Sequence, residues 1–131
     1  MKMSSKARYG LLAVVELAKN YQNGVCSLTD VAQKTGVAVK YLEQIISILK
    51  KDNVVTAYRG SCGGYVLSDS PENISVGRIL RSLEDNLELV DCNVNTCSKS
   101  DSCATKKLWS NLQNSINTYL DTISLKQLLE S

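Results

Sequence analysis

Apolar residues recur at helical spacing near the start of the chain and predict two helices. The first is expected over residues 5–20, and the polar stretch 20–24 ends it. Its apolar positions are Leu11, Leu12, Val14, Val15 and Leu17. Ser27, with Asp30 three residues later, resembles a capping box and predicts a second helix of about two turns that stops near Gly36.

A third helix, with one apolar and one polar face, is predicted after the turn at residues 35–37. Its apolar positions fall at helical spacing and are expected in the core: Leu42, Ile45, Ile46 and Leu49. The opposite face carries Lys40, Glu43, Gln44 and Ser47. Two short helices joined by a glycine-containing turn are typical of a helix-turn-helix motif, whose second helix enters the major groove of DNA.

A β-hairpin is predicted next. Residues 54–58 and 65–67 are β-rich, and the glycine-rich stretch 59–64 separates them. A hairpin at this position would be the wing of a winged helix. Arg59, beside Gly60 at the hairpin tip, could enter a narrow minor groove, where the negative potential is strongest.

The third helix would present four side chains to the base edges: Lys40, Tyr41, Glu43 and Gln44. Glutamine can pair with adenine, and glutamate can accept a hydrogen bond from the cytosine amino group. Phosphate contacts are expected from Lys2, Lys6 and Lys50, with a steep dependence on salt. The alternative is a small α/β core with solvated charges, because helix-turn-helix patterns also occur by chance.

The C-terminal part is predicted to be helical on both sides of a polar loop. Ser75 is expected to cap a helix over residues 76–83, and a longer helix runs from Ala104 to about Asp121. The longer helix has an apolar stripe that suits a partner helix: Leu108, Leu112, Ile116, Tyr119 and Ile123.

The predicted fold class is mainly α with a small β-hairpin. A winged helix-turn-helix DNA-binding domain is expected over residues 1–83, followed by a cysteine-containing loop over residues 84–103. A dimerisation helix and a C-terminal tail are expected over residues 104–131.

Composition narrows the classes of function. The chain has 131 residues, the size of one domain, with a net charge of +2 and no histidine. Without histidine, Ser-His-Asp and Cys-His catalysis and Cys/His zinc fingers are excluded, so no enzyme is expected. The longest apolar run, residues 11–15, is too short to span a membrane, and no signal-peptide pattern follows Met1. A cytoplasmic location without a membrane partner is therefore expected.

Cys92, Cys97 and Cys103 lie close together in a polar stretch, whereas Cys26 and Cys62 stand alone. Thiolates suit iron-sulfur clusters and zinc, and a loop allows three of them to converge on one centre. Zinc is the weaker interpretation because paired CxxC knuckles are missing. Free thiols or a labile disulfide are the alternative. Cys26 is expected to be a small buried hydrophobe, and Cys62 an exposed thiol at the wing tip that oxidation could modify.

Four groups of residues carry a resemblance to a known family. They are the Lys-Ala-Arg-Tyr-Gly run at 6–10, the Tyr-Leu-Glu-Gln run at 41–44, the glycines and Arg59 of residues 59–65, and the three cysteines followed by Leu108 and Trp109. Together they resemble the IscR-like winged-helix transcription regulators, which bind iron-sulfur clusters. NsrR and CymR, of the same wider family, share the winged-helix fold and the long dimerisation helix.

The resemblance implies a homodimeric regulator of double-stranded operator DNA that represses cluster-assembly genes when iron-sulfur supply is adequate. Its implied cluster ligands are Cys92, Cys97 and Cys103. Its implied base-reading residues are Glu43 and Gln44, with Arg59 in the minor groove. A 2Fe-2S cluster is favoured and a 4Fe-4S cluster is compatible. A cluster-assembly scaffold or a cysteine desulfurase system is the implied protein partner.

The chain departs from the family pattern at three positions. Lys106 stands where IscR-like proteins usually have a histidine ligand, and a lysine amine must lose its proton before it binds iron. Arg8 stands where NsrR has an aspartate ligand, and Lys40 replaces a small polar residue of the reader helix. The fourth ligand stays open among a water or small thiol and several side chains: Thr105, Asp91, Asp101, Cys26 and Cys62.

Two other functions fit the same residues. The three thiols could sense oxidants, nitric oxide or zinc in a transcription regulator without a cluster. Alternatively, the chain could be an iron-sulfur or redox carrier in which the helix-turn-helix pattern is accidental. A carrier would show no salt-sensitive preference for operator DNA over random duplex.

Overall fold

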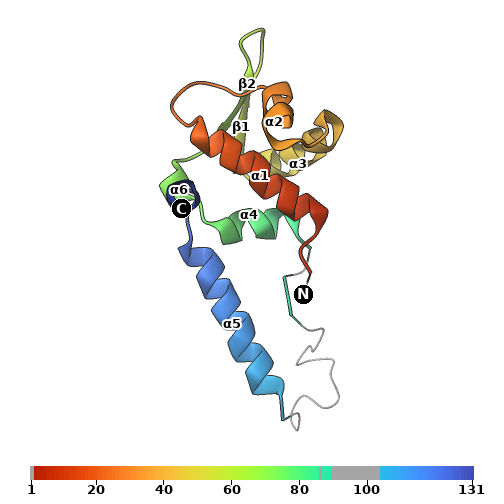
Figure 1. Ribbon diagram of the computed structural model, residues 1–131, viewed down its shortest axis with the longest axis vertical. Coiled ribbons are helices and arrows are strands. Elements are labelled where there is room, and N and C mark those ends of the chain that lie inside the picture. Colours follow the sequence, from red (N-terminus) through yellow and green to blue (C-terminus); the bar gives the residue numbers. More distant parts are fainter. Residues whose placement is uncertain (1, 86, 90–103) are drawn as a thin grey trace.

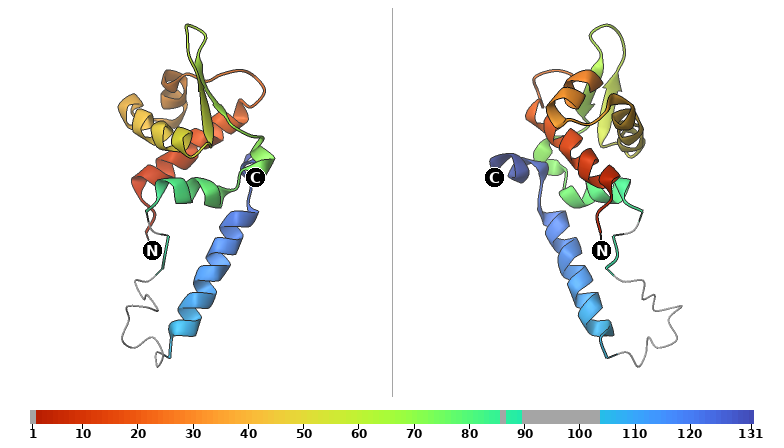
Figure 2. Two further views of the ribbon diagram at one scale, coloured as in Figure 1. Left: turned by 180° about the vertical axis from the view of Figure 1, so that it is seen from behind. Right: turned by 45° about the vertical axis from the view of Figure 1, so that its right-hand side comes forward.

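The computed structural model describes residues 2–85, 87–89 and 104–131. The elements in chain order are α1 (Ser5–Lys19), α2 (Leu28–Thr35), α3 (Val39–Lys51), β1 (Val55–Tyr58), β2 (Gly64–Leu67), the 3-10 helix η1 (Pro71–Asn73), α4 (Val76–Leu83), α5 (Lys106–Thr122) and α6 (Leu125–Glu130). The first four helices and the hairpin form one body, and α5 extends away from it (Figure 1). Figure 2 shows the same arrangement from two further sides. The structure thus confirms the predicted mainly helical fold with a hairpin.

Serine caps define the helix starts as the sequence predicts. The Ser27 hydroxyl accepts a hydrogen bond from the backbone N–H of Asp30, and that of Ser75 accepts one from Arg78, both at 3.1 Å. Gly36 ends α2 in the left-handed conformation, with φ of 75°, where a residue without a Cβ is favoured. Helices α1, α2 and α4 therefore begin and end within a few residues of the predicted bounds.

The core lies between α1, α3, α4 and the hairpin. The predicted apolar face of α3 is buried, because Leu42, Ile45 and Leu49 are fully inaccessible and Ile46 is 2% exposed. Gly10 of α1 is also buried, and a Cβ at this position would meet the side chains of Leu83 and Ile45. Burial of one face fixes which side of α3 can contact other molecules.

The wing has a third backbone segment that the sequence does not reveal. Strands β1 and β2 pair antiparallel, with Val55 opposite Leu67 and Tyr58 opposite Gly64. Cys26 then pairs with Tyr65 on the other edge of β2, through N–H to oxygen distances of 2.9 and 2.8 Å. The wing is thereby attached to the loop between α1 and α2.

The end of the chain returns to the body after α5. The Val76 N–H donates to the Ile123 carbonyl at 2.8 Å, and the Leu125 N–H donates to the Ile74 carbonyl at 3.0 Å. Leu125 is fully buried, and Ser124 and Gln127 form a capping box at the start of α6. The region expected to be a C-terminal tail therefore contains a docked helix. Ile123, predicted in the α5 stripe, lies just beyond α5 and packs on the core.

Candidate nucleic-acid interface and cysteine segment

The outer face of α3 presents the predicted polar side chains. Lys40, Glu43, Gln44 and Ser47 are exposed, and the opposite face of the helix is buried in the core. No side chain caps the first turn, because the N-cap position is Ala38. Three long polar side chains, those of Lys40, Glu43 and Gln44, are thus exposed at the N-terminal half of α3, where recognition helices contact DNA.

Tyr41 occupies a different position from its neighbours. Its side chain is half-buried, and its ring packs edge-to-face on Tyr9 of α1, with 6.0 Å between ring centroids and 87° between ring planes. The Arg8 guanidinium lies 5.7 Å from the centre of the Tyr9 ring. The packing of Tyr41 joins α3 to α1, and its reading of a base stays a prediction.

The wing tip is exposed as predicted. Arg59 and Gly60 lie in the turn, where Gly60 has φ of 106° and accepts a backbone hydrogen bond from Gly63 at 3.0 Å. Only glycine adopts this φ without strain. Tyr58, at the end of β1, is 57% exposed beside Arg59. Figure 1 shows the hairpin and α3 on the body, at the end of the molecule opposite to the start of α5.

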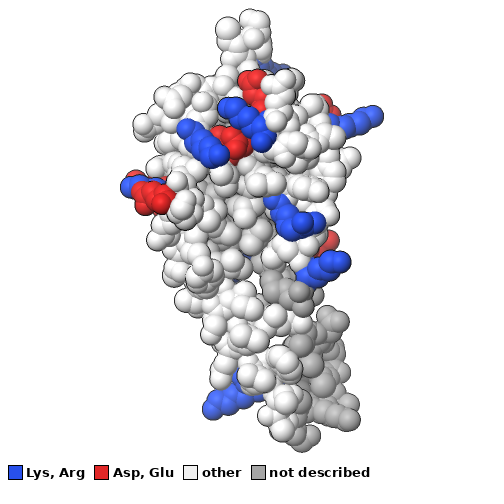
Figure 3. Space-filling model, viewed as in Figure 1, with Lys and Arg blue, Asp and Glu red and all other residues white. Residues whose placement is uncertain are grey.

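Charge is mixed over the surface. Figure 3 shows basic and acidic side chains interspersed on the face it displays. Lys2 and Lys50, predicted to contact phosphates, are exposed, and Lys6 is half-buried. With a net charge of +2, attraction to DNA must come from local placement of cations rather than from a strong overall field.

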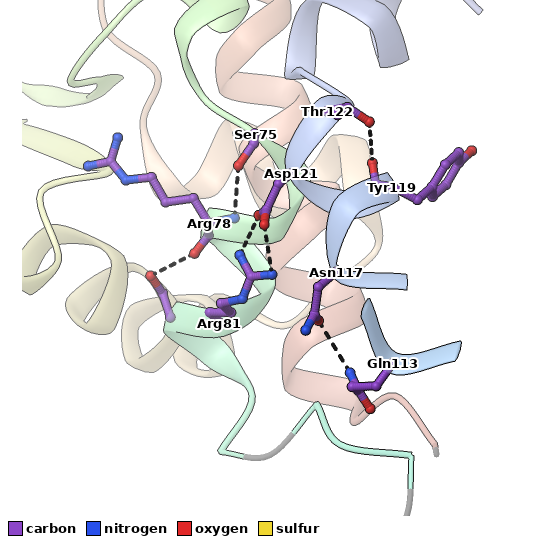
Figure 4. Close-up of polar contacts among 9 residues, drawn as sticks. Ser75, Arg78, Arg81, Gln113, Asn117, Tyr119, Asp121 and Thr122 are labelled. Atoms are coloured by element: carbon purple, nitrogen blue, oxygen red, sulfur yellow. Dashed lines mark hydrogen bonds and ion pairs between the residues drawn. The ribbon is translucent and has the colours of Figure 1, made fainter. Parts of the chain in front are cut away.

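Helix α4 connects α3 to α5. The Arg78 guanidinium donates to the carbonyl oxygens of Asp52 and Asn53, at 3.5 and 3.2 Å, just after the C-terminus of α3. One turn later, Arg81 forms a bidentate ion pair with Asp121 of α5, with one Nη2 to Oδ2 distance of 3.2 Å (Figure 4). Gly77 permits this approach, because a Cβ there would meet the Asp121 carboxylate. The sequence does not predict the contacts of either arginine. Their three-residue spacing shows that both lie on one side of α4, but it does not indicate their partners.

Cys92, Cys97 and Cys103 lie outside the described residues, so their predicted role as ligands stays a prediction. The segment that leads to them is attached to α5. The Gln113 amide oxygen accepts from the Leu89 N–H at 2.7 Å, and its nitrogen donates to the Leu87 carbonyl at 3.1 Å. Gln113 also donates to Asn117 at 3.2 Å, which orients the amide group (Figure 4).

An open cleft of about 360 Å³ lies beside this attachment. It is lined by Arg81, Glu84, Asp85, Leu87, Glu88, Gln113 and Asn117. In the described ranges, no group of three or more Cys, His, Asp or Glu side chains is arranged to hold a metal ion. Lys106, where the resemblance implies a histidine, is the half-buried first residue of α5.

The two isolated cysteines belong to the wing region. Cys26 is buried at 6% exposure, and burial raises the pKa of its thiol. Cys62 is exposed near the hairpin tip. The predicted burial of Cys26 and exposure of Cys62 are confirmed, and oxidation of Cys62 stays a prediction. The wing lies at the end of the molecule opposite to the start of α5 (Figure 1).

Helix α5 has an apolar side that nothing in the described chain covers. None of its residues is buried, and three members of the predicted stripe are exposed: Leu108 at 55%, Leu112 at 41% and Tyr119 at 64%. In the part of the chain that the structure describes, no helix is long and apolar enough to cross a membrane. Leu108, Leu112 and Tyr119 thus form an exposed apolar strip along α5.

Comparison with known proteins identifies the family. Residues 3–131 match the Rrf2 family, described as an iron-dependent transcriptional regulator. The HTH-type transcriptional regulator IscR of Aliivibrio salmonicida is 35% identical over 130 residues, which cover 98% of this chain and 77% of the relative.

Solved structures agree with this match. CymR, the global cysteine regulator of B. subtilis, has a TM-score of 0.85 and 34% identity, over 98% of this chain and 95% of that one. IscR of T. potens has a TM-score of 0.79 and 36% identity, over 99% and 87%. The predicted winged helix-turn-helix fold and the IscR-like resemblance are confirmed, as is the expectation that the chain is not an enzyme. The chain belongs to the Rrf2 family of DNA-binding transcription regulators.

Proposed function

We propose that this regulator is a cytoplasmic homodimeric repressor whose operator binding depends on an iron-sulfur cluster held by Cys92, Cys97 and Cys103. One observation carries the proposal: α5 holds the segment leading to these cysteines through Gln113 and also presents an unpartnered apolar side. The same helix therefore joins the sensing segment to the surface that would form the dimer.

The dimer would form along the apolar side of α5. Helix α5 has 17 residues and is about 25 Å long, enough for an extended contact with a second copy. Two reader helices in such a dimer must lie ~34 Å apart to enter successive major grooves. The operator would then contain two half-sites related by the two-fold axis of the dimer.

Each protomer would read one half-site with α3 and the wing. Glu43 and Gln44 would contact base edges, with Lys40 and Tyr41 beside them, and Arg59 and Gly60 would approach the minor groove. This assignment is supported by the exposure of all but Tyr41, which is half-buried. Exposed lysines would supply phosphate contacts and a strong salt dependence.

The donor set fits a cluster chemically. Three thiols in a short polar stretch are soft ligands, and Cys92 follows Leu89 by three positions while Cys103 directly precedes Ala104. Such a cluster, when bound, supplies a signal of iron and redox state at this segment. The fourth ligand is not histidine, since the chain contains none. A weak or exchangeable fourth ligand would favour ready loss of the cluster, and a scaffold or desulfurase system would restore it.

Residues of this chain would then carry the change to DNA. Gln113 ties the entry of the cysteine segment to α5, the Arg81–Asp121 pair ties α5 to α4, and Arg78 ties α4 to the C-terminal end of α3. A movement of α5 would therefore be transmitted through these contacts to α4, and from α4 to the C-terminal end of α3, the reader helix. We propose that the regulator represses cluster-assembly genes when its cluster is bound.

A thiol, nitric oxide or zinc sensor without a cluster is the second candidate. The absence of histidine from the chain favours it, as does the similarity to the cysteine regulator CymR. In that case the three cysteines would react directly, through their thiolates. DNA reading by α3 and the wing would be the same in both candidates.

Iron and acid-labile sulfide, measured with a visible spectrum on protein purified without oxygen, distinguish the two. We expect near-stoichiometric iron and sulfide, lost in Cys92→Ala and retained in Cys62→Ala, a control thiol at the wing tip. The iron content also separates two-iron from four-iron clusters. Iron-free preparations of all three proteins would contradict the cluster and leave direct thiol or zinc sensing.

A further inference from the structure

One apolar side chain is exposed at the start of α3, at the border between its buried face and its polar face. Val39, the first residue of the helix, is 39% exposed. It does not belong to the core cluster or to the partly buried apolar residues that pack against the core. Val37, two residues earlier, is buried at 7% exposure and supplies the apolar packing of the turn. Val39 is therefore free to contact another molecule.

The position of Val39 on the helix places it among the predicted base-reading residues. Residues four apart are neighbours on a helix surface, so Val39 adjoins Glu43 as Lys40 adjoins Gln44. The first turn of a recognition helix comes closest to the base edges, and no capping side chain covers this turn. Any DNA that Glu43 contacts would also lie against Val39.

The major groove offers one apolar group to such a side chain. All four bases present hydrogen-bonding atoms there, and thymine alone adds an apolar C5-methyl group. A single valine between charged neighbours is too small a patch to dock a protein chain. Its chemistry matches a methyl group within a polar groove.

We infer that Val39 is a specificity-determining residue that contacts the C5-methyl group of one thymine in each half-site. The inference rests on the proposed reading of DNA by α3 and adds a base preference to it. This contact would bury an apolar surface about as large as one methyl group. Such burial strengthens binding roughly fourfold for each half-site.

Uracil substitution tests this contact without changing base pairing. The probe is the duplex that this protein recovers from a random-sequence pool, with each thymine replaced in turn by deoxyuracil, at one fixed salt concentration. We expect one position per half-site where uracil weakens binding about fourfold. Val39→Ala should bind the thymine duplex about fourfold more weakly than the unsubstituted protein does. The two proteins should bind the uracil duplex with equal affinity.

Matched variants separate the contact from a general loss of binding. Ser47→Ala, on the same exposed face two turns later, should keep the full uracil penalty. Val39→Thr keeps the shape of the side chain and should retain part of the penalty. Circular dichroism melting of Val39→Ala should match the unsubstituted protein, because the side chain lies outside the core.

Two results overturn the inference while leaving DNA reading by α3 intact. One is a duplex in which no uracil weakens binding, and the other is a uracil penalty that Val39→Ala leaves unchanged. If the protein recovers no preferred sequence from the pool, the proposed DNA reading fails and the inference fails with it.

Discussion

Two buried or crowded glycines show how single residues set the packing of this body. A Cβ on Gly10 would meet the flexible end of the Leu83 side chain, which can move. A Cβ on Gly64 would meet the backbone carbonyl of Cys26, which is fixed by hydrogen bonds to Tyr65. Alanine should therefore destabilise the protein more at Gly64 than at Gly10.

Gly64→Ala should lower the free energy of unfolding by roughly 1–3 kcal/mol, because overpacking against backbone forces the wing edge apart. Gly10→Ala should cost less, since alanine gains up to about 1 kcal/mol of helix propensity and Leu83 can move. Urea denaturation of both variants measures the difference. An equal or larger loss in Gly10→Ala would contradict the role assigned to the Cys26 bridge.

The two wing-region thiols should differ in reactivity. Burial raises the pKa of Cys26, so less of its thiolate is present at any given pH than in an ordinary cysteine, and its sulfur is inaccessible. Brief iodoacetamide treatment at pH 8, followed by peptide mass mapping, should label Cys62 and leave Cys26 unmodified until the protein is unfolded. Rapid labelling of Cys26 in native protein would show that the bridge to Tyr65 opens readily.

Local sequence signals account for the elements that local contacts form. The caps at Ser27 and Ser75 and the buried face of α3 were predictable because each depends on residues within a few positions. Cys26 pairs with Tyr65 from a distant position, and no pattern near Cys26 marks that partner. Helix α6 was missed because six residues show little periodicity, although the Ser124 and Gln127 spacing could have revealed its capping box.

The candidate site also has features that the local sequence predicts and others that depend on contacts between distant elements. The exposed polar face of α3 followed from its helical period, and the stripe on α5 followed from its spacing. The connections made by Arg78, Arg81 and Gln113 could not be predicted, because they depend on how α4 and α5 meet in space. The exposure of Val39 could not be predicted, because an apolar residue in a helical pattern is normally assigned to the core.

The Arg81–Asp121 pair should matter more for DNA binding than for stability. Its side chains are 42% and 49% exposed, so Asp121→Asn should lower the free energy of unfolding by less than about 1 kcal/mol. Operator affinity should fall severalfold, because α5 is then less firmly oriented relative to α4. Lys126→Ala, which breaks the exposed pair with Glu72 at 3.9 Å, is the control and should change neither. Unchanged operator affinity in Asp121→Asn would remove α4 from the proposed connection.

At the scale of the whole molecule, assembly should depend on the stripe of α5. Leu112→Glu places a charge on the apolar side and should produce a folded monomer with much weaker operator binding, because two half-sites are no longer bound together. Asn114→Glu adds the same charge at an exposed position outside the stripe and should remain dimeric. Sedimentation velocity and circular dichroism measure assembly and folding separately. A dimeric Leu112→Glu protein would place the interface elsewhere.

The attachment of α5 at its C-terminal end has a geometric consequence. Backbone hydrogen bonds at Val76 and Leu125 hold that end against the body, while its other end begins about 25 Å away. A sideways movement of about 2 Å at Lys106 would then rotate the whole helix by only about 5° around the attached end. In the proposed dimer, α5 of the second copy would rotate by the same amount because of the two-fold symmetry. The angle between the two protomers would therefore change by the sum of the two rotations. A rearrangement smaller than one side chain could thus change the alignment of the two half-site readers.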